Sequence, residues 1–236
     1  MTHDIFSRLV LLTGEEGLEK LSRSSVLVFG AGGVGSWAAE ALVRSGIGKI
    51  GIIDYDTVCA SNVNRQIEAT TLTLGLPKAQ TLKTRLLESN PNCEVTAWDK
   101  LFCKENANSF NIENTDYVID AIDTLNHKID LIETVCKAGI TLFSSMGMAL
   151  RIDPAKIKTG SIWDTTGCPL AKLVRQGLRK RGFSSDFTVV YSQELIPDAR
   201  GTSASGEKTP NGTIVTVTAS AGLLLASLVL RDILGR

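Results

Sequence analysis

The sequence predicts an α/β fold in which a mostly parallel sheet carries helices on both faces and is extended by antiparallel strands in the C-terminal third. Two observations support this prediction. Up to about residue 150, continuous apolar runs of strand length alternate with segments of helical periodicity, as in sheets built from helical crossovers. Beyond residue 150 the alternation loosens, and strand-like runs flank a single helix. Such runs are typical of edge or antiparallel strands.

The first 150 residues are expected to build most of the sheet. Each strand is predicted from a short apolar run, and each helix from apolar residues spaced by about 3.6 and stopped by glycine or proline. An amphipathic helix over 4–22 leads into this region. The predicted strands are 25–30, 49–54, 94–98, 117–122 and 140–145, and the predicted helices are 35–46, 77–91 and 125–139.

The remaining residues are expected to complete the same domain. Strand-like segments over 156–163 and 186–194 flank a predicted helix over 168–182, and 197–212 is rich in turn-forming residues and predicts a surface loop. The apolar segment 214–230 contains four hydroxyl residues and a glycine, and it is shorter than the roughly 20 residues of a spanning helix. It is therefore predicted as a buried strand followed by a helix, without stable membrane insertion.

Charge and cysteine usage narrow the class of protein. The formal net charge is zero, so a nucleic-acid site would have to be a local patch. The cysteine count is odd, no C-x-x-C spacing occurs and no apolar signal segment opens the chain, which together favour a cytoplasmic protein with free thiols. The cysteines are Cys59, Cys93, Cys103, Cys136 and Cys168, and only His3 and His127 could join them, so no zinc site is expected.

A glycine-rich loop joins the first predicted strand to the first predicted helix of the sheet. Gly30, Gly32 and Gly35 satisfy G-x-G-x-x-G, and Asp54 follows at the end of the next strand. In this context glycines let the backbone approach phosphate, the helix N-terminus supplies amide donors, and the carboxylate accepts hydrogen bonds from ribose. The loop predicts a nucleotide site in a Rossmann-like sheet; the alternative is a tight turn in an unrelated α/β domain.

Charged residues near this loop favour ATP over a nicotinamide dinucleotide. A triphosphate attacked at its α-phosphate needs cations for the leaving pyrophosphate and a carboxylate for magnesium. Arg65 and Lys78 can supply the cations, and Asp120 and Asp123 lie at the end of the strand over 117–122. Singly, each has another interpretation: a loop salt bridge for Arg65, a solvated helix residue for Lys78, and a turn cap for Asp120.

These motifs carry a family resemblance. "VLVFGAGGVGS", "DYDTVCASNVNRQ", "PKA" and "DAID" resemble the ubiquitin-activating-enzyme-like (ThiF/MoeB-type) adenylating superfamily over residues 6–150. The resemblance implies one adenylating domain over 1–236, with a nucleotide-binding half over 1–150 and a substrate-binding and dimer half over 151–236. It also implies ATP and Mg²⁺ as cofactors, and it leaves open a monovalent cation, Na⁺ or K⁺.

The resemblance further assigns roles to individual residues. It implies a homodimer in which Arg8 crosses into the neighbouring active site, and it implies that Asp123 holds magnesium. The implied catalytic residues are Arg8, Arg65, Lys78 and Asp123, and the implied cofactor-binding residues are Gly30, Gly32, Gly33, Gly35, Asp54, Asp56, Asn62 and Gln66.

Further segments, among them "NVNRQIEA", "NPNCEVT" and "IDPAKI", resemble the tRNA threonylcarbamoyladenosine dehydratases within this superfamily. That resemblance implies ATP-dependent activation of a threonyl carboxylate in tRNA, followed by ring closure with net loss of water and release of AMP and pyrophosphate. A sulfur-transfer partner protein stays open. The alternatives are adenylation of the C-terminus of a ubiquitin-like or sulfur-carrier protein, against which the missing C-x-x-C pairs count, and a scaffold with a dead site.

A basic stripe on the predicted helix over 168–182 fits an RNA substrate. Lys172, Arg175 and Arg179 recur at helical spacing, while Leu170, Leu173, Val174 and Leu178 form an apolar side. Such a stripe could contact tRNA phosphates, although a solvated helix face is the alternative. Cys59, Cys168 and His127 are weaker candidates for a chemical role, because adenylation followed by cyclisation needs no thiol.

Overall fold

The computed structural model describes residues 5–195 and 211–236. Its centre is a seven-stranded sheet in the order β3-β2-β1-β4-β5-β7-β6. All neighbouring strands are parallel except β6 and β7, which pair antiparallel at the edge. This confirms the predicted fold class. The strands are β1 Ser25–Phe29, β2 Lys49–Ile53, β3 Glu94–Trp98, β4 Tyr117–Asp120, β5 Thr141–Ser145, β6 Ile157–Ser161 and β7 Thr188–Ser192.

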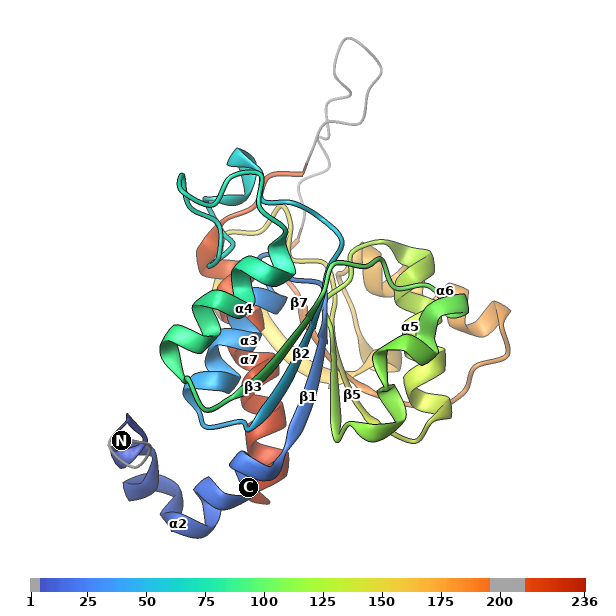
Figure 1. Ribbon diagram of the computed structural model, residues 1–236. Helices are drawn as coiled ribbons and strands as arrows, with labels where there is room; N and C mark the ends of the chain where they lie inside the picture. Colours follow the sequence, from blue (N-terminus) through green and yellow to red (C-terminus); the bar gives the residue numbers. More distant parts are fainter. Residues whose placement is uncertain (1–4, 196–210) are drawn as a thin grey trace.

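Helices cover both faces of the sheet (Figure 1). One face carries α3 Gly35–Arg44, α4 Lys78–Ser89 and α7 Val215–Leu234, and the other carries α5 Leu125–Lys137 and α6 Pro169–Lys180. Each face has its own apolar core. The predicted helices therefore lie where a doubly wound sheet requires them. Short 3₁₀ helices connect these elements: η1 Ala60–Asn62, η2 Lys104–Phe110, η3 Ile112–Asn114, η4 Pro154–Lys156 and η5 Ile162–Asp164.

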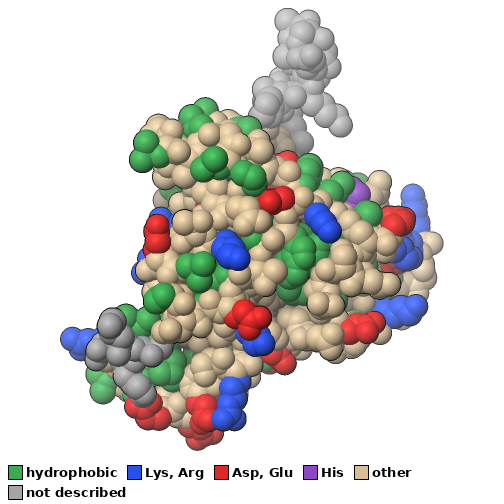
Figure 2. All heavy atoms as spheres, in the orientation of Figure 1, with side chains coloured by type: hydrophobic (Ala, Val, Ile, Leu, Met, Phe, Trp, Pro, Cys, Tyr) green, Lys and Arg blue, Asp and Glu red, His purple; other side chains and the backbone are tan. Residues whose placement is uncertain are grey.

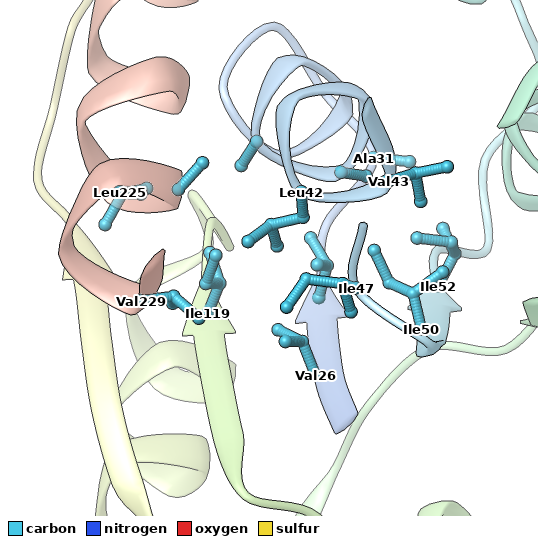
Figure 3. Close-up of a cluster of buried hydrophobic side chains, with 14 of the residues drawn as sticks. Val26, Ala31, Leu42, Val43, Ile47, Ile50, Ile52, Ile119, Leu225 and Val229 are labelled. Carbon is cyan, nitrogen blue, oxygen red and sulfur yellow. The ribbon is translucent and has the colours of Figure 1, made fainter. Parts of the chain in front are cut away.

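The prediction of a strand followed by a helix over 214–230 is wrong, because α7 is one continuous helix from Val215. The β-branched residues at its start favour a strand locally, but tertiary packing decides otherwise. Gly222 allows α7 to approach α3 so closely that an added Cβ would lie 2.3 Å from the Val34 carbonyl oxygen. In Figure 3, Leu225 and Val229 point toward Leu42 and the sheet.

By length and composition alone, α7 could cross a membrane, since its mean hydropathy is 1.7 over 20 residues. Its buried residues recur along one helical face and pack in the core beside α3: Val217, Thr218, Ala221, Gly222, Leu225, Ala226 and Val229. This burial supports the predicted core position.

The N-terminal helix α2 Ser7–Arg23 lies beside the C-terminal end of α7 (Figure 1). Gly14 has φ 72° and kinks the helix. Leu21 is fully buried, whereas Leu11 and Leu12 are 80% and 70% exposed. The helix thus contacts the domain on one side and presents apolar side chains on another. The predicted 197–212 loop lies outside the described residues except for its last two.

Candidate active site

A cavity of about 680 Å³ opens at the carboxyl ends of β1, β2, β4 and β5. This edge is where open α/β sheets bind ligands. Residues that are distant in sequence meet here because the strands are parallel. The predicted site residues that line the cavity are Gly30, Gly32, Gly33, Asp54, Asp56, Asn62, Arg65, Gln66, Lys78 and Asp123.

The glycine loop is shaped by close backbone approaches. Gly30 has φ 94°, and a Cβ there would lie 2.8 Å from the Ala121 carbonyl oxygen. A Cβ on Gly35 would lie 1.8 Å from the Gly30 carbonyl oxygen, so Gly35 closes the turn and does not line the cavity. Around Gly32 the nearest atom to a Cβ would be Gln66 Nε2, 3.9 Å away. At Gly32 the loop therefore presents its backbone to the cavity with little side-chain cover, whereas at Gly33 the Arg65 side chain lies close, 3.1 Å from where a Cβ would be.

Asp54 joins the end of β2 to the glycine loop. Its Oδ2 accepts a hydrogen bond from the Ala31 amide at 2.7 Å, and its Oδ1 accepts one from the Asp56 amide at 2.8 Å. Burial raises the pKa of this carboxyl, while the amide hydrogen bonds and nearby Lys78 oppose the rise. The carboxylate is thus fixed in orientation at the cavity wall.

The two predicted cations occupy different environments. Lys78 is 6% exposed, and its Nζ donates to Asp56 Oδ2 at 2.8 Å, so it is not a solvated helix residue. Arg65 is half-buried, and its Nη1 donates to the Ser61 carbonyl at 2.6 Å and to Asn64 Oδ1 at 3.0 Å. No ion pair holds Arg65 among the described residues. Both side chains line the cavity.

The two aspartates of "DAID" lie in different environments. Asp120 is fully buried, pairs with Lys128 Nζ at 2.8 Å and accepts from Ser144 Oγ at 2.6 Å. It also accepts from the Ile122 amide, as a turn cap does. Asp123 is exposed and lines the cavity. The prediction that both carboxylates lie beside the ligand is therefore wrong for Asp120, and only Asp123 lines the cavity.

A model of the ThiF family matches residues 6–236 of this chain. The chain belongs to the ThiF family. This confirms the resemblance inferred from the glycine loop and its charged partners.

Relatives of this ThiF-family chain include RNA-modifying enzymes. The tRNA threonylcarbamoyladenosine dehydratase of Bacillus subtilis is 41% identical, over 97% of this chain and 94% of that protein. Structures of the E. coli tRNA N6-threonylcarbamoyladenosine dehydratase TcdA with AMP and with ATP match with TM-scores of 0.90 and 0.89, at 34% and 33% identity, over 99% of this chain and 95% of TcdA. The adenylyltransferase and sulfurtransferase MOCS3 of Drosophila yakuba is 37% identical, but over 63% of this chain and 32% of that protein.

Other predicted site residues of this ThiF-family chain lie away from the cavity. Arg8 is exposed on α2. On α6, Lys172 is exposed, but Arg175 donates to Thr165 Oγ1 and the guanidinium of Arg179 lies 5.2 Å from the Trp163 ring centre. Two of the three cations on the stripe thus make contacts within the chain, although Arg179 stays exposed.

The apolar side of α6 also differs from the prediction. Ala171, Val174 and Leu178 are buried, whereas Leu173 is 47% exposed and lines the cavity. Of the weaker candidates, Cys168 lines the cavity, while Cys59 and His127 do not.

Glu68 and Arg151 are among the buried ionisable residues of this ThiF-family chain that the sequence did not predict. Glu68 is 2% exposed, and burial raises its pKa to about 7. Arg151 is 3% exposed and lines the cavity. No local pattern marks either residue. The available signal is the resemblance: Glu68 lies within "NVNRQIEA", and Arg151 stands just before "IDPAKI".

Proposed function

We propose that this chain is an ATP-dependent tRNA threonylcarbamoyladenosine dehydratase. The observation that carries the proposal is the convergence of the glycine loop, Lys78, Arg65 and Asp123 on one cavity. High coverage by relatives with that activity supports the choice of substrate. The enzyme activates a carboxylate as an acyl adenylate, and an atom of the same side chain then closes the ring intramolecularly.

Each cavity residue has a role in adenylation that its environment suits. Backbone amides of the glycine loop and the start of α3 hold phosphates, and Asp54 accepts from the ribose hydroxyls. Lys78 and Arg65 offset the charge that develops on the departing pyrophosphate. Asn62, Gln66 and Asp56 line the same wall and complete the nucleotide site.

Magnesium fits this donor set. Mg²⁺ in nucleotide sites is usually held by one or two carboxylates together with phosphates and waters. Asp123 provides an exposed carboxylate at the cavity, so it would hold the ion. The ion would supply positive charge next to the phosphates. A monovalent cation, a sulfur-transfer partner and a cytoplasmic location are further parts of the proposal.

Nucleoside mass analysis tests the reaction. Modified tRNA incubated with the protein and ATP should lose one water from threonylcarbamoyladenosine, while AMP and pyrophosphate form in equal amounts. Without ATP, or with Lys78→Met, the nucleoside should keep its mass. If the nucleoside stays unchanged with active protein and ATP, the proposal is wrong. AMP formation that depends instead on a small carrier protein would favour the alternative that MOCS3 represents.

We also propose that the protein is a homodimer in which Arg8 completes the partner's site. Arg8 lies outside the cavity of its own chain, and the nearby Leu11 and Leu12 are exposed. Figure 2 shows further hydrophobic side chains over the 60–76 segment, where Leu72, Leu74 and Leu76 are exposed. Burial of such surfaces favours association.

Complementation tests the shared site. Arg8→Ala and Asp123→Ala chains should each be inactive alone. In a 1:1 mixture, random exchange makes half of the dimers mixed with one intact site each, so about a quarter of wild-type activity should return. A fully active monomer at the assay concentration, or no recovery after exchange shown by mass spectrometry, would contradict the arrangement.

A further inference from the structure

Arg151 is a buried cation on the cavity wall with unused donors. It follows β5 by six residues, is 3% exposed and lines the same cavity as the glycine loop. Its Nη1 donates to the carbonyl oxygens of Gly147 at 2.6 Å and Ala149 at 3.2 Å. Its Nε and Nη2 have no hydrogen-bond partner among the described residues. No carboxylate in that part of the chain forms an ion pair with it.

The two unpaired nitrogens indicate the shape of the missing partner. Nε and Nη2 form the side of the guanidinium whose N–H bonds run parallel, and this fork matches the two oxygens of a carboxylate. The bonds of Nη1 to the loop backbone hold the guanidinium in place. A buried charge without a partner is costly, so a ligand that supplies two acceptor oxygens would be bound strongly here.

The start of α6 adds to the same subsite. Cys168, Pro169 and Leu170 line the cavity, and a Cβ on Gly147 would lie 3.4 Å from Leu170 Cβ. Gly147, whose carbonyl oxygen accepts from Arg151, therefore packs against the first turn of α6. The first turn of a helix has N–H groups without intrahelical acceptors and a partial positive charge, which favours an anion.

The loop that bears Arg151 is connected to the nucleotide half of the cavity. The Leu150 amide donates to the Gly212 carbonyl at 2.9 Å, and Asn64 Nδ2 donates to the Thr213 carbonyl at 2.9 Å. Arg65, which donates to Asn64, is thereby linked to the same wall. An anion at Arg151 would share one cavity with the nucleotide phosphates.

We propose that Arg151 and the first turn of α6 bind the carboxylate that becomes adenylated. The inference rests on the proposed function and locates the acyl half of its substrate. One carboxylate oxygen attacks the α-phosphorus of ATP, an O–P bond forms, and the bond to pyrophosphate breaks. The attacking atom of the side chain next adds to the acyl carbon, AMP leaves with the carboxylate oxygen, and a proton passes to solvent. Arg151 then faces the remaining acyl oxygen and stabilises its developing negative charge.

The first experiment uses the wild-type protein. Two tRNA anticodon stem-loops are compared, one with the threonylcarbamoyl carboxylate free and one with it blocked as a methyl ester. A bidentate charge-assisted contact predicts that the acid binds about 10- to 100-fold more tightly than the ester in the presence of a non-hydrolysable ATP analogue. Equal affinity of wild-type protein for acid and ester would overturn the subsite.

The second experiment assigns the discrimination to Arg151. Arg151→Met should bind acid and ester equally and raise KM for the modified RNA, while its affinity for ATP stays unchanged. Arg151→Lys keeps the charge but not the fork, so it should recover part of the discrimination. Lys156→Met is the matched control, because Lys156 is exposed on η4, just after Arg151, and does not line the cavity.

The outcomes separate the two proposals. If wild-type protein dehydrates the RNA but Arg151→Met still discriminates acid from ester, only the subsite is wrong. If wild-type protein binds ATP but neither binds nor converts the modified RNA, the proposed function is wrong and the subsite is lost with it. Should Arg151→Met unfold, the Arg151→Lys and wild-type comparisons still decide.

Discussion

The cavity edge and helix α6 both gather cations, but they hold them differently. At the cavity edge, Lys78 is almost fully buried, and the side-chain carbons of Arg65 lie beside Gly33 of the glycine loop. Along α6, Lys172 and Lys180 are exposed, while Arg181 pairs with acidic residues of α5. Cations at the edge converge on a shared cavity, whereas those on α6 are distributed over a surface and partly bound by the protein itself.

The difference shows what a charge pattern in a sequence can predict. The carboxyl ends of parallel strands must meet at one edge of the sheet, so polar residues placed just beyond those ends, such as Asp54 and Asp123, are brought to the same cavity. A helical stripe fixes only the direction in which side chains leave the helix. Whether those side chains are free depends on neighbours such as Thr165 and Trp163, which the stripe does not reveal.

The largest effect on activity should come from Asp123→Ala at the cavity edge. Loss of the carboxylate proposed to hold Mg²⁺ should reduce ATP turnover by at least about a thousandfold, or roughly 4 kcal/mol of barrier. The free energy of unfolding should hardly change, because the side chain is exposed. Asp130→Ala, which removes a partner of Arg181 near α6, is the control and should keep turnover. Near-normal turnover of Asp123→Ala would remove the functional distinction between the two regions.

Lys128→Met tests whether the edge depends on a buried ion pair. Lys128 and Asp120 are both fully buried, so the variant leaves an uncompensated carboxylate and should lower the free energy of unfolding by about 3–5 kcal/mol. Arg181→Met removes the exposed pairs between α6 and α5 and should cost about 0–1 kcal/mol. Denaturant unfolding measures both. Equal losses would mean that burial does not distinguish the two pairs.

The sequence is most informative where local pattern and topology agree. Apolar runs located the buried strands, and the glycine loop with Asp54 and Lys78 located the cavity. At the start of α7 the two disagree, because its β-branched residues favour a strand locally while packing on α3 makes it helical. Long-range burial explains that error.

Burial also explains why parts of the site could not be predicted. Glu68 and Arg151 lie in or beside segments that carry the resemblance, but their burial arises only when distant segments enclose them. Asp120 and Asp123 belong to one short motif, yet Lys128 and Ser144 turn the first into a structural residue. Residue type and spacing alone could not separate these roles.

The effect of Glu68→Gln on the free energy of unfolding should depend on pH, because Glu68 is a buried acid near the cavity edge. Burial raises its pKa from 4.5 to about 7, so the folded state keeps a proton that the unfolded chain releases above pH 4.5. This contribution lowers wild-type stability as pH rises from about 4.5 to 7. The stability gain of Glu68→Gln over wild type should therefore be larger at pH 8 than at pH 4, by up to about 3 kcal/mol. A pH-independent difference in denaturant unfolding would contradict the raised pKa.

The smallest effect is expected on the salt dependence of RNA binding, which should differ between Lys172 and Arg175 of α6. Each phosphate contact contributes about 0.9 to the slope of log K against log salt on duplex nucleic acid, and about 0.7 on single strands. If α6 contacts tRNA, Lys172→Ala should flatten the slope by nearly one unit, because its side chain is exposed. Arg175→Ala should leave the slope almost unchanged and instead lower stability slightly, because it loses the contact with Thr165.

The triple change of Lys172, Arg175 and Arg179 to glutamate extends this test. It adds repulsion along the stripe and should weaken tRNA binding further at low salt, with ATP affinity preserved because none of the three lines the cavity. Filter binding across a salt series measures the slopes. If Arg175→Ala flattens the slope as much as Lys172→Ala does, Arg175 leaves Thr165 when RNA binds. Arg175 would then exchange its contact with Thr165 for a contact with an RNA phosphate. If neither single change alters the slope and the triple variant binds normally, α6 is a solvated face, and the RNA must contact another part of the cavity rim.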